Sequence, residues 1–373
     1  METEVLKIDS SRIDLAEIGR AARLIDAGEL VGFPTETVYG IACRVETGSL
    51  AGLSEAKGRA LDKPFTLHIA QRDTVRQYIP TMGIRAEKLI AKAWPGPLTI
   101  IFELEAADLE KQRQALDAEI FRNLYKDSSI GVRCPDNAVA GELLCRTKSP
   151  VVAPSANIAG QPPATQAQQV LSQFAGRVRL LLDGGPCRYG KSSTVVRLAQ
   201  NGLEFVRDGV YSRRQVEEMA KTIFLFVCTG NTCRSPMAEA LFSHYLAEKL
   251  NCEVDQLECK GYKIVSAGTA GVVGFAATPE AAAACAAKGI DITGHRAKGL
   301  SVQLIDEADY IFAMSGQHID RIVGLSGRSA GKCRLLAENM DIHDPIGQPQ
   351  SVYNNCAQLI EQAVRKKVGG LVL

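Results

Sequence analysis

The chain has 373 residues, which is too long for one ordinary hydrophobic core, so two domains are expected. Hydrophobic residues make up 46% of the chain and charged residues 23%, which excludes a disordered protein. The net charge of +1 excludes a global field that would draw the protein to nucleic acid or membrane, so any basic site must be local.

The first half of the chain contains several predicted elements. Residues 13–29 (IDLAEIGRAARLIDAGE) carry apolar residues at helical spacing and predict an amphipathic helix. The stretch LVGFPTETVYG predicts a short strand that runs into a turn, and LTIIFEL and RLLLDGG have the length and apolar content of strands. Residues 105–127 are rich in charge and predict a solvated surface helix.

A polar helical stretch with few core residues, RDGVYSRRQVEEMAKT, predicts the join between two domains. We place the first domain at residues 1–212, a linker at residues 213–221 and the second domain at residues 222–373. Beyond the join, the apolar stretches IFLFVC, YKIVSAG and DYIFAMS alternate with the helical patterns SPMAEALFSHYLAEKL, TPEAAAACAAKG and NNCAQLIEQAVRKKV. This alternation predicts an α/β domain with a parallel, flavodoxin-like sheet and helices on both faces.

Cysteine usage and the N-terminal stretch indicate a cytoplasmic protein. The eleven cysteines are scattered without a C-x-x-C framework, which favours reduced thiols. The stretch METEVLKIDSSRID is acidic and lacks the apolar segment of a signal peptide. No run of 18 apolar residues is present, so we expect no membrane partner.

Three short stretches of the first domain combine cations with small polar side chains. They are KGRALDKP with Lys57, Arg59 and Lys63, APSANIAG with Ser155 and Asn157, and GVRCP with Arg133. A solvated, basic helix end would explain the first stretch by itself. Taken together, the three stretches predict a binding site for a polyphosphate.

These stretches resemble the YrdC-like family of threonylcarbamoyl-AMP synthases over residues 10–210. FPTETVYG, the K-x-R pair, AWPGPLT, the S-x-N pair, and SSTVV followed by RDG stand in the family's order. The resemblance implies a twisted α/β sheet with a basic concave cavity. It also implies synthesis of L-threonylcarbamoyl-AMP from L-threonine, bicarbonate and ATP, with release of pyrophosphate. A separate tRNA-modifying transferase would take the product to adenosine in tRNA.

The same resemblance implies the site residues of the first domain. ATP would contact Lys57, Arg59, Lys63, Ser155, Asn157 and Arg207, and threonine would contact Thr35, His68, Arg133 and Ser193. Arg133 would pair with the threonine carboxylate, because a planar guanidinium fixes the orientation of its partner. His68 has a structural interpretation of equal weight. No residues have metal-site spacing, so we expect Mg²⁺ to arrive with ATP and no cofactor to be tightly bound.

The second domain opens with a loop suited to one phosphoryl group. In VCTGNTCRS, Cys228 ends the apolar strand and Arg234 lies six residues on, with Gly230 permitting a tight curl between them. Backbone N–H groups in such a curl form an anion nest, and Ser235 followed by Pro236 begins a helix whose positive end faces that nest. The thiol of Cys228 should therefore have a pKa below the ordinary value of about 8.5.

This pattern predicts covalent phosphoryl transfer. The guanidinium of Arg234 can hold two phosphate oxygens while Cys228 forms a phosphocysteine that water later hydrolyses. Asp344 in DIHDPIG precedes a proline and is the candidate general acid, and Asp341 is a weaker one.

Residues 222–373 resemble the low-molecular-weight protein-tyrosine phosphatase family. The resemblance implies that Cys228 is the nucleophile, Arg234 the phosphoryl-binding residue and Asp344 the general acid. The phosphate loop would consist of Thr229, Gly230, Asn231, Thr232, Cys233 and Ser235, with Asn231 and Ser235 ordering it. Cys233 is either a partner for oxidised Cys228 or a packing residue.

The substrate of the second domain stays open between two phosphoprotein classes. The stretch DPIG lacks the aromatic residues that flank a phenol ring in vertebrate-type members, which bears on phosphotyrosine. CTGNTCRSPMAE is similar to bacterial members that act on phosphoarginine, in which a threonine at the position of Thr232 is associated with that preference. An arsenate reductase would need a further cysteine pair, and FAMSGQH has none.

The alternative from another class is a nucleotide- or RNA-binding module with a degenerate phosphatase scaffold. Intact K-x-R, S-x-N, C-x5-R and DP signatures argue against it.

Overall fold

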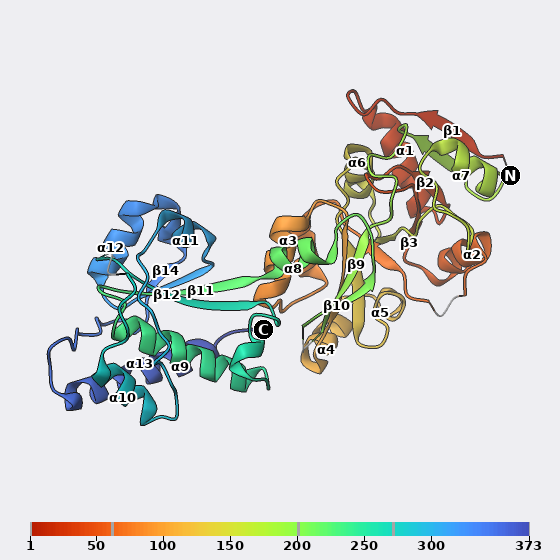
Figure 1. Cartoon of the computed structure of the whole chain (residues 1–373). Coiled ribbons are helices and arrows are strands. Elements are labelled where there is room, and N and C mark those ends of the chain that lie inside the picture. The colour runs from red at the N-terminus through yellow and green to blue at the C-terminus, as the bar shows by residue number, and fades with distance from the viewer. Residues whose placement is uncertain (1, 61–62, 200–201, 271–272, 373) are drawn as a thin grey trace. The chain divides into compact units, whose positions relative to one another are not determined.

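The computed structural model describes residues 2–60, 63–199, 202–270 and 273–372 (Figure 1). It divides into two compact units, Met1–Ala220 and Lys221–Leu373. Each unit has its own β-sheet with helices packed on it.

The first unit contains a mixed sheet of ten strands. Their order is β1 (Glu4–Lys7), β8 (Leu180–Asp183), β2 (Val31–Phe33), β3 (Gly40–Arg44), β7 (Val151–Val152), β4 (Thr66–His68), β6 (Ser129–Arg133), β5 (Leu98–Glu103), β9 (Thr194–Ala199) and β10 (Gly202–Arg207). Parallel pairs such as β4–β6 and β5–β9 are interspersed with antiparallel pairs such as β3–β7 and β5–β6. This order brings strands from widely separated parts of the sequence side by side.

Helix α1 (Leu15–Asp26) confirms the amphipathic helix expected at residues 13–29. It begins where it does because the Asp14 carboxylate accepts hydrogen bonds from the free N–H groups of Ala16 and Glu17. Its apolar face buries Ile18 and Ile25 in a core cluster that also contains residues of β2, β8 and α6 (Ala138–Arg146). Other helices of the first unit are α2 (Thr47–Lys57), the 3-10 helix η1 (Arg72–Gln77), α3 (Ile84–Ala93) and α7 (Ala167–Phe174).

The charged segment 105–127 is helical as expected, but it is not wholly solvated. It forms two helices, α4 (Ala106–Ala115) and α5 (Ala118–Leu124). Asp108 and Gln112 of α4 are buried, and the buried Tyr125 hydroxyl donates a 2.7 Å hydrogen bond to the carbonyl oxygen of Tyr78. The segment is therefore partly inside the unit.

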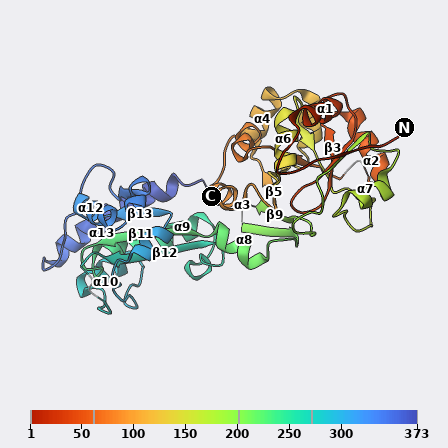
Figure 2. The same ribbon diagram turned by 90° about the horizontal axis from the view of Figure 1, so that it is seen from above.

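Of residues 213–221, expected as a linker, residues 213–220 belong instead to the first unit and Lys221 to the second. Helix α8 (Arg213–Ala220) packs against α3 (Figure 1 and Figure 2). It buries Val216 and Ala220 in the core cluster that also contains Trp94. Two apolar residues one helical turn apart were enough to anchor a helix that is otherwise polar, so the division between the units falls after Ala220.

The second unit has a sheet of four parallel strands in the order β12 (Tyr262–Gly268), β11 (Thr222–Cys228), β13 (Tyr310–Ala313) and β14 (Cys333–Leu335). Helices α9 (Arg234–Lys249), α10 (Pro279–Ala286) and α13 (Gln350–Gly369) lie on one face, and α11 (Val302–Glu307) and α12 (Gly316–Leu325) lie on the other (Figure 1). Two 3-10 helices, η2 (Val254–Gln256) and η3 (Gly327–Gly331), complete the unit. The expected flavodoxin-like sheet is thus confirmed.

The central strand β11 fixes the position of the phosphate loop. Alternate side chains of a strand point to opposite faces. Phe224 and Phe226 pack on Phe242 of α9, with ring centroids 4.7 and 5.2 Å apart, while Leu225 and Val227 pack in the cluster that contains Ile322 of α12. Because both faces are filled, the carboxyl end of β11 is held firmly where Cys228 begins the loop.

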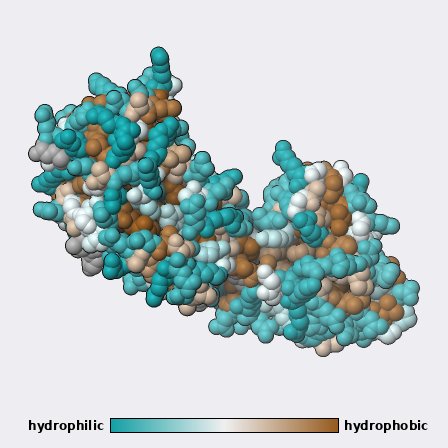
Figure 3. Space-filling view, turned by 180° about the vertical axis from the view of Figure 1, so that it is seen from behind, coloured by the Kyte–Doolittle hydropathy of each residue, from teal (hydrophilic) through white to brown (hydrophobic). Residues whose placement is uncertain are grey.

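No helix among residues 2–60, 63–199, 202–270 and 273–372 is long and apolar enough to cross a membrane. On the face shown in Figure 3, hydrophilic residues predominate on both units and hydrophobic residues are interspersed among them.

Candidate functional sites

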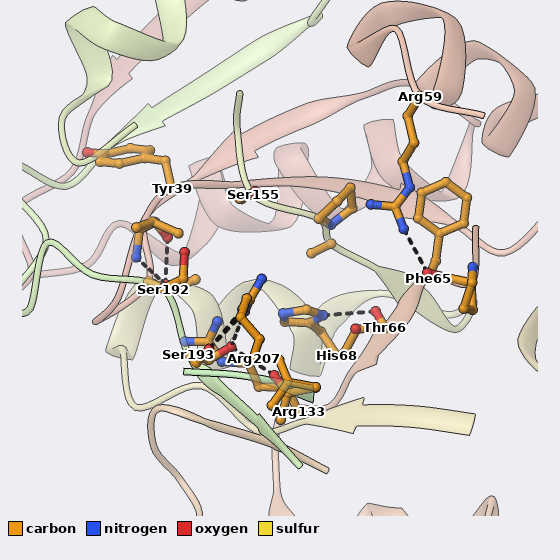
Figure 4. Close-up of a pocket in the computed structure, with 18 residues that line it drawn as sticks. Tyr39, Arg59, Phe65, Thr66, His68, Arg133, Ser155, Ser192, Ser193 and Arg207 are labelled. Carbon is orange, nitrogen blue, oxygen red and sulfur yellow. Dashed lines mark hydrogen bonds between the residues drawn. The ribbon is translucent and has the colours of Figure 1, made fainter. Parts of the chain in front are cut away.

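The first unit contains a cavity that collects residues from β3, β4, β5, β6 and β9 and from the loops around them. Seven of the ten predicted ligand residues line this cavity (Figure 4): Thr35, Arg59, His68, Arg133, Ser155, Ser193 and Arg207. Lys57, Lys63 and Asn157 do not line it. The K-x-R and S-x-N stretches, about a hundred residues apart in sequence, therefore meet at one site.

Three guanidinium groups give the cavity its positive charge. Arg59 donates a 2.8 Å hydrogen bond to the carbonyl oxygen of Pro64 and stacks over the Phe65 ring, and its Nε has no partner among the described residues. Arg207 donates from Nη2 to the carbonyl oxygen of Ser193 at 2.8 Å. Burial lowers the pKa of both Arg59 and Arg207, yet arginine stays protonated at neutral pH. Together with Arg133, they suit a multiply charged anion.

Lys57 does not line the cavity but holds a loop that forms part of its wall. Its buried Nζ donates hydrogen bonds to the carbonyl oxygens of Ser155 and, at 2.5 Å, of Asn157. The Ser155 hydroxyl in turn donates to Oδ1 of Asn157 at 2.5 Å. Lys57 and Asn157 thus hold the loop that presents Ser155, and burial lowers the pKa of Lys57 to about 8. Lys63 is exposed and lies outside the cavity lining.

His68 lines the cavity, and its imidazole ring is neutral. Its Nδ1 lies 3.1 Å from the carbonyl oxygen of Thr66, which can only accept, so the proton is on Nδ1. Burial, and then the charge of Arg133, lower the pKa of His68 to about 3. Nε2 is left as a hydrogen-bond acceptor. Ser193 also lines the cavity, with its hydroxyl 2.9 Å from that of Thr99.

Arg133 is already engaged by a carboxylate that the motifs did not point to. Its Nη2 lies 2.9 Å from Oε1 of Glu36 and 2.6 Å from the hydroxyl of Thr37. The side chains of Arg133 and Glu36 are 7% and 1% exposed, and the structure describes no partner for Nε of the arginine or Oε2 of the glutamate. Both hydrogens of Nη2 are in use, so two-point binding of a substrate carboxylate requires Glu36 or Thr37 to release one of them.

In the second unit, the loop after β11 surrounds the sulfur of Cys228 with donors. The backbone N–H of Asn231 points to Sγ at 3.3 Å, and the hydroxyl of Ser235 lies 3.0 Å from it. Ser235 also accepts a 2.9 Å hydrogen bond from Nδ2 of Asn231, which leaves its own hydrogen for the sulfur. The arrangement suits a thiolate.

Asn231 is the residue that orders this loop. Its φ of 56° lies in the left-handed region, which asparagine adopts more readily than most residues. Its side-chain Nδ2 donates to the Ser266 hydroxyl at 2.8 Å, and its Oδ1 accepts from the N–H of Lys298 at 2.7 Å. The predicted ordering roles of Asn231 and Ser235 correspond to contacts that the structure contains.

Arg234 and Asp344 meet at the mouth of the loop although 110 residues separate them. Nη2 of Arg234 is paired with Oδ2 of Asp344, and Nη1 donates a 2.9 Å hydrogen bond to the carbonyl oxygen of Ile342. Asp341 instead accepts from the N–H of Gly316 at 3.0 Å and ties down α12. The geometry thus favours Asp344 over Asp341 as the acid.

Cys233 lies in the same loop but has the character of a packing thiol. Its Sγ is 3.9 Å from Oδ1 of Asp344 and 3.7 Å from the hydroxyl of Thr232. Burial raises the pKa of Cys233 to about 11, so at neutral pH it is protonated.

Comparison with known proteins places both units in families. Residues 23–209 match the Sua5/YciO/YrdC family model, described as "Telomere recombination", and residues 223–371 match the model described as "Low molecular weight phosphotyrosine protein phosphatase". The chain belongs to both families.

Each unit is similar to proteins that are named for an activity. The YrdC-family unit is similar to the threonylcarbamoyl-AMP synthase of Bacillus subtilis, at 31% identity over 61% of this chain and 64% of that protein. The phosphatase-family unit is similar to the probable low molecular weight protein-tyrosine-phosphatase EpsP of Ralstonia nicotianae, at 34% identity over 39% of this chain and 92% of that protein. The chain spans 64% and 58% of the lengths of the synthases of B. subtilis and Pyrococcus abyssi.

A solved structure has a similar fold. That of P. abyssi Sua5 complexed with L-threonine has a TM-score of 0.52 and 20% sequence identity. The similarity covers 97% of this chain and 98% of that one.

Several residues of the two sites were missed by sequence reasoning. In the YrdC-family unit this is Glu36, although it lies inside the FPTETVYG motif, where a buried arginine would need a counter-charge. In the phosphatase-family unit, His295 contacts the carbonyl oxygen of Asn231 at 2.8 Å, and Ser266 and His318 contact loop side chains. Nothing in the local sequence around His295 and Ser266 marks them.

Proposed function

We propose that the YrdC-family unit forms L-threonylcarbamoyl-AMP from L-threonine, bicarbonate and ATP. The observation that carries this proposal is the meeting of the K-x-R and S-x-N stretches with Arg133 and Arg207 at one cavity. The named activity of the similar synthases and the threonine bound to the P. abyssi protein support it. The product would pass to a tRNA-modifying transferase in the cytoplasm.

The proposed reaction needs positioning and charge neutralisation more than covalent catalysis. The threonine amine combines with bicarbonate to give a carbamate and water. A carbamate oxygen then attacks the α-phosphorus of ATP, and the bond to pyrophosphate breaks. Arg59 and Arg207 would neutralise the phosphates, while Arg133 would hold the threonine carboxylate. Nε2 of His68 would accept a hydrogen bond from threonine.

Magnesium is proposed to enter as a component of the ATP substrate. Among the described residues, no group of three or more His, Cys, Asp or Glu side chains is placed to hold a metal ion. Phosphate oxygens would then supply the ligands that Mg²⁺ prefers.

Pyrophosphate release tests this proposal. With ATP, Mg²⁺ and bicarbonate, release should depend on threonine, and Arg59→Ala should lower it about 10- to 100-fold because a charge-assisted phosphate contact is lost. Lys92→Ala, an exposed change on α3, is the control and should have no effect. Lys63→Ala tests whether the exposed lysine contacts ATP. Threonine-independent release would contradict the synthase, and ATP binding without any pyrophosphate release would favour a nucleotide-binding module.

We further propose that the phosphatase-family unit hydrolyses phosphorylated proteins. The supporting observation is the cradle of N–H and hydroxyl donors around Cys228 with Arg234 and Asp344 at its mouth. Sγ of Cys228 would bond to phosphorus as the ester or amidate bond breaks, and Asp344 would give its proton to the leaving group. Water would then cleave the S–P bond and release inorganic phosphate. The substrate must first displace Asp344 from Arg234.

The proposed substrate is phosphoarginine. Ile346, 55% exposed, stands after Pro345 where an aromatic residue would flank a phenol ring, so the site lacks that wall. We expect a higher kcat/KM for phosphoarginine peptides than for phosphotyrosine peptides. The opposite ranking would reject this assignment and leave the phosphatase mechanism in place.

Replacement of the nucleophile tests the mechanism itself. Cys228→Ser should abolish hydrolysis of an aryl phosphate, because serine lacks a thiolate at neutral pH. Cys259→Ser changes an exposed cysteine of the same unit and should leave turnover intact. Undiminished turnover in Cys228→Ser would exclude the phosphocysteine pathway.

A further inference from the structure

A histidine outside the motifs is connected to the phosphate-binding arginine. His318 lies in the first turn of α12 and is 6% exposed. Its Nε2 lies 3.0 Å from the hydroxyl of Thr229, the loop residue next to Cys228, and its Nδ1 lies 2.9 Å from the hydroxyl of Ser315. The Thr229 hydroxyl lies 3.2 Å from Nη2 of Arg234. A continuous chain of contacts therefore runs from α12 to the guanidinium.

Donor and acceptor chemistry fixes the direction of the bond between Arg234 and Thr229. A guanidinium can only donate, so the Thr229 oxygen accepts from Arg234. Among the described residues, Nε2 of His318 is placed to accept the hydrogen of Thr229, and in that role it carries a lone pair. The imidazole proton is then on Nδ1, where it is donated to Ser315. This arrangement requires a neutral His318.

The charges around His318 favour that neutral state. Arg234 approaches it from α9, and Asp341 and Asp344 approach it from the segment before α13. Burial has the largest effect and lowers the pKa of His318, the charge of Arg234 lowers it further, and the two carboxylates oppose this. A protonated ring would point a second donor at Thr229, so the threonine hydrogen would turn away from His318 and the hydrogen bond from Thr229 to Nε2 would be lost.

We propose that His318 is a positioning residue for Arg234, which it holds through the Thr229 hydroxyl in the orientation that receives a phosphoryl group. In the resting state Arg234 has three tethers: Thr229, the carbonyl oxygen of Ile342 and Asp344. When a phosphate displaces Asp344, the other two remain. Thr229 is the tether that α12 controls, and so α12 preorganises the anion site. This inference rests on the proposed phosphatase function.

Phosphate binding by the full-length protein tests the inference without requiring turnover. Thr229→Val removes the hydroxyl at nearly constant shape, His318→Phe removes the acceptor, and Thr229→Ser keeps the hydroxyl. We expect each of the first two changes to weaken inorganic phosphate binding about tenfold, as for loss of a hydrogen bond to a charged group. The double variant should be no weaker than either single one, and Thr229→Ser should bind like the wild type.

Two further readouts separate positioning from a merely structural role. The ¹⁵N spectrum of the wild type, with the His318 signal assigned by its loss in His318→Phe, should show the neutral form protonated at Nδ1. The kcat/KM for an aryl phosphate should fall in parallel with phosphate affinity. Additive losses in the double variant, an unchanged phosphate affinity in the single variants, or a ring protonated at Nε2 would each overturn the inference. A wild type that binds phosphate but hydrolyses no aryl phosphate would instead reject the proposed function.

Discussion

Arg133 and Glu36 form an ion pair that is buried at the cavity of the first unit. Removing two charges from water costs several kcal/mol per ion, and the pair leaves one atom of each side chain without a partner. Because of this cost, stabilisation of the fold does not by itself explain why the ion pair is buried. Under the proposed function, Glu36 would hold the place that a threonine carboxylate takes when substrate binds.

The variant Glu36→Gln tests whether a threonine carboxylate takes the place of the Glu36 carboxylate at Arg133. The variant leaves Arg133 as a buried, unpaired charge, and we expect the first unit to lose about 3 kcal/mol of stability. Threonine should restore part of the loss, so it should raise the Tm of the variant more than that of the wild type. Fluorescence of Trp94, the one tryptophan of the sequence, reports on this unit in the full chain.

The control for Glu36→Gln is a surface ion pair of the same unit. Glu142→Gln removes a half-exposed partner of Arg146 and should change stability by less than about 1 kcal/mol. An equal effect of threonine on all three proteins would contradict the proposed exchange of carboxylates at Arg133.

His68 makes the stability of the first unit depend on pH. Its pKa is about 3 in the folded protein, whereas an unfolded chain has the ordinary value of about 6.5. Between these values the unfolded state binds a proton that the folded state excludes, so stability should fall as pH falls from 6.5 towards 3. The expected slope from this residue is up to about 1.4 kcal/mol per pH unit.

Urea unfolding followed by Trp94 fluorescence at several pH values measures this slope. His68→Gln cannot take up the proton, so its stability should decline less steeply below pH 6.5. Parallel slopes for the two proteins would mean that the ring is already protonated in the folded state.

At the scale of elements, the phosphate loop rests on the end of the neighbouring strand β12. A Cβ atom on Gly268 would lie 2.8 Å from the carbonyl oxygen of Thr229 and 3.0 Å from the backbone nitrogen of Asn231. Glycine is required here by the close approach of two backbones, and its φ is unexceptional. The loop and β12 therefore act as one piece.

Gly268→Ala should push the loop away from β12. We expect the kcat/KM for an aryl phosphate to fall about 100-fold, because small misplacements of catalytic groups have effects of this size. Gly324→Ala on α12, where nothing lies within 4 Å of the new methyl group, should leave activity unchanged. Equal activity of Gly268→Ala and the wild type would show that the loop tolerates displacement.

The sequence predicted some elements better than others for physical reasons. Alternating apolar strands and helices were sufficient for the parallel sheet of the second unit. The strand order of the first unit could not be predicted, because β8 inserts between β1 and β2, and the two-residue β7 is too short to carry a pattern. Contiguous motifs identified most cavity residues, whereas Glu36, His295 and His318 act through partners that only tertiary folding brings near.

At the scale of the whole molecule, the division after Ala220 means that the complete first unit includes helix α8. Val216 and Ala220 of α8 are fully buried in its core. Burying a valine side chain is worth about 1.5–3 kcal/mol, and the alanine adds to this. A chain that ends at the sequence-predicted boundary would lack both contacts.

Chains of residues 1–212 and 1–220 compare the two boundaries directly. We expect the longer one to unfold cooperatively in urea by Trp94 fluorescence, and the shorter one to be less stable by about 2–4 kcal/mol. A 1–220 chain with Val216→Ala should fall between them. Coincident midpoints for the two lengths would restore residues 213–221 to the role of linker.

The resting pair of Arg234 and Asp344 also bears on which competing anions the second unit accepts. A sulfate ester carries one negative charge and would merely exchange for the carboxylate that it displaces. A phosphate monoester near neutral pH carries close to two charges and brings additional attraction into the nest. Asp344 would thus compete with incoming anions for Arg234. A monoanion of similar shape would gain no electrostatic advantage when it displaces this carboxylate.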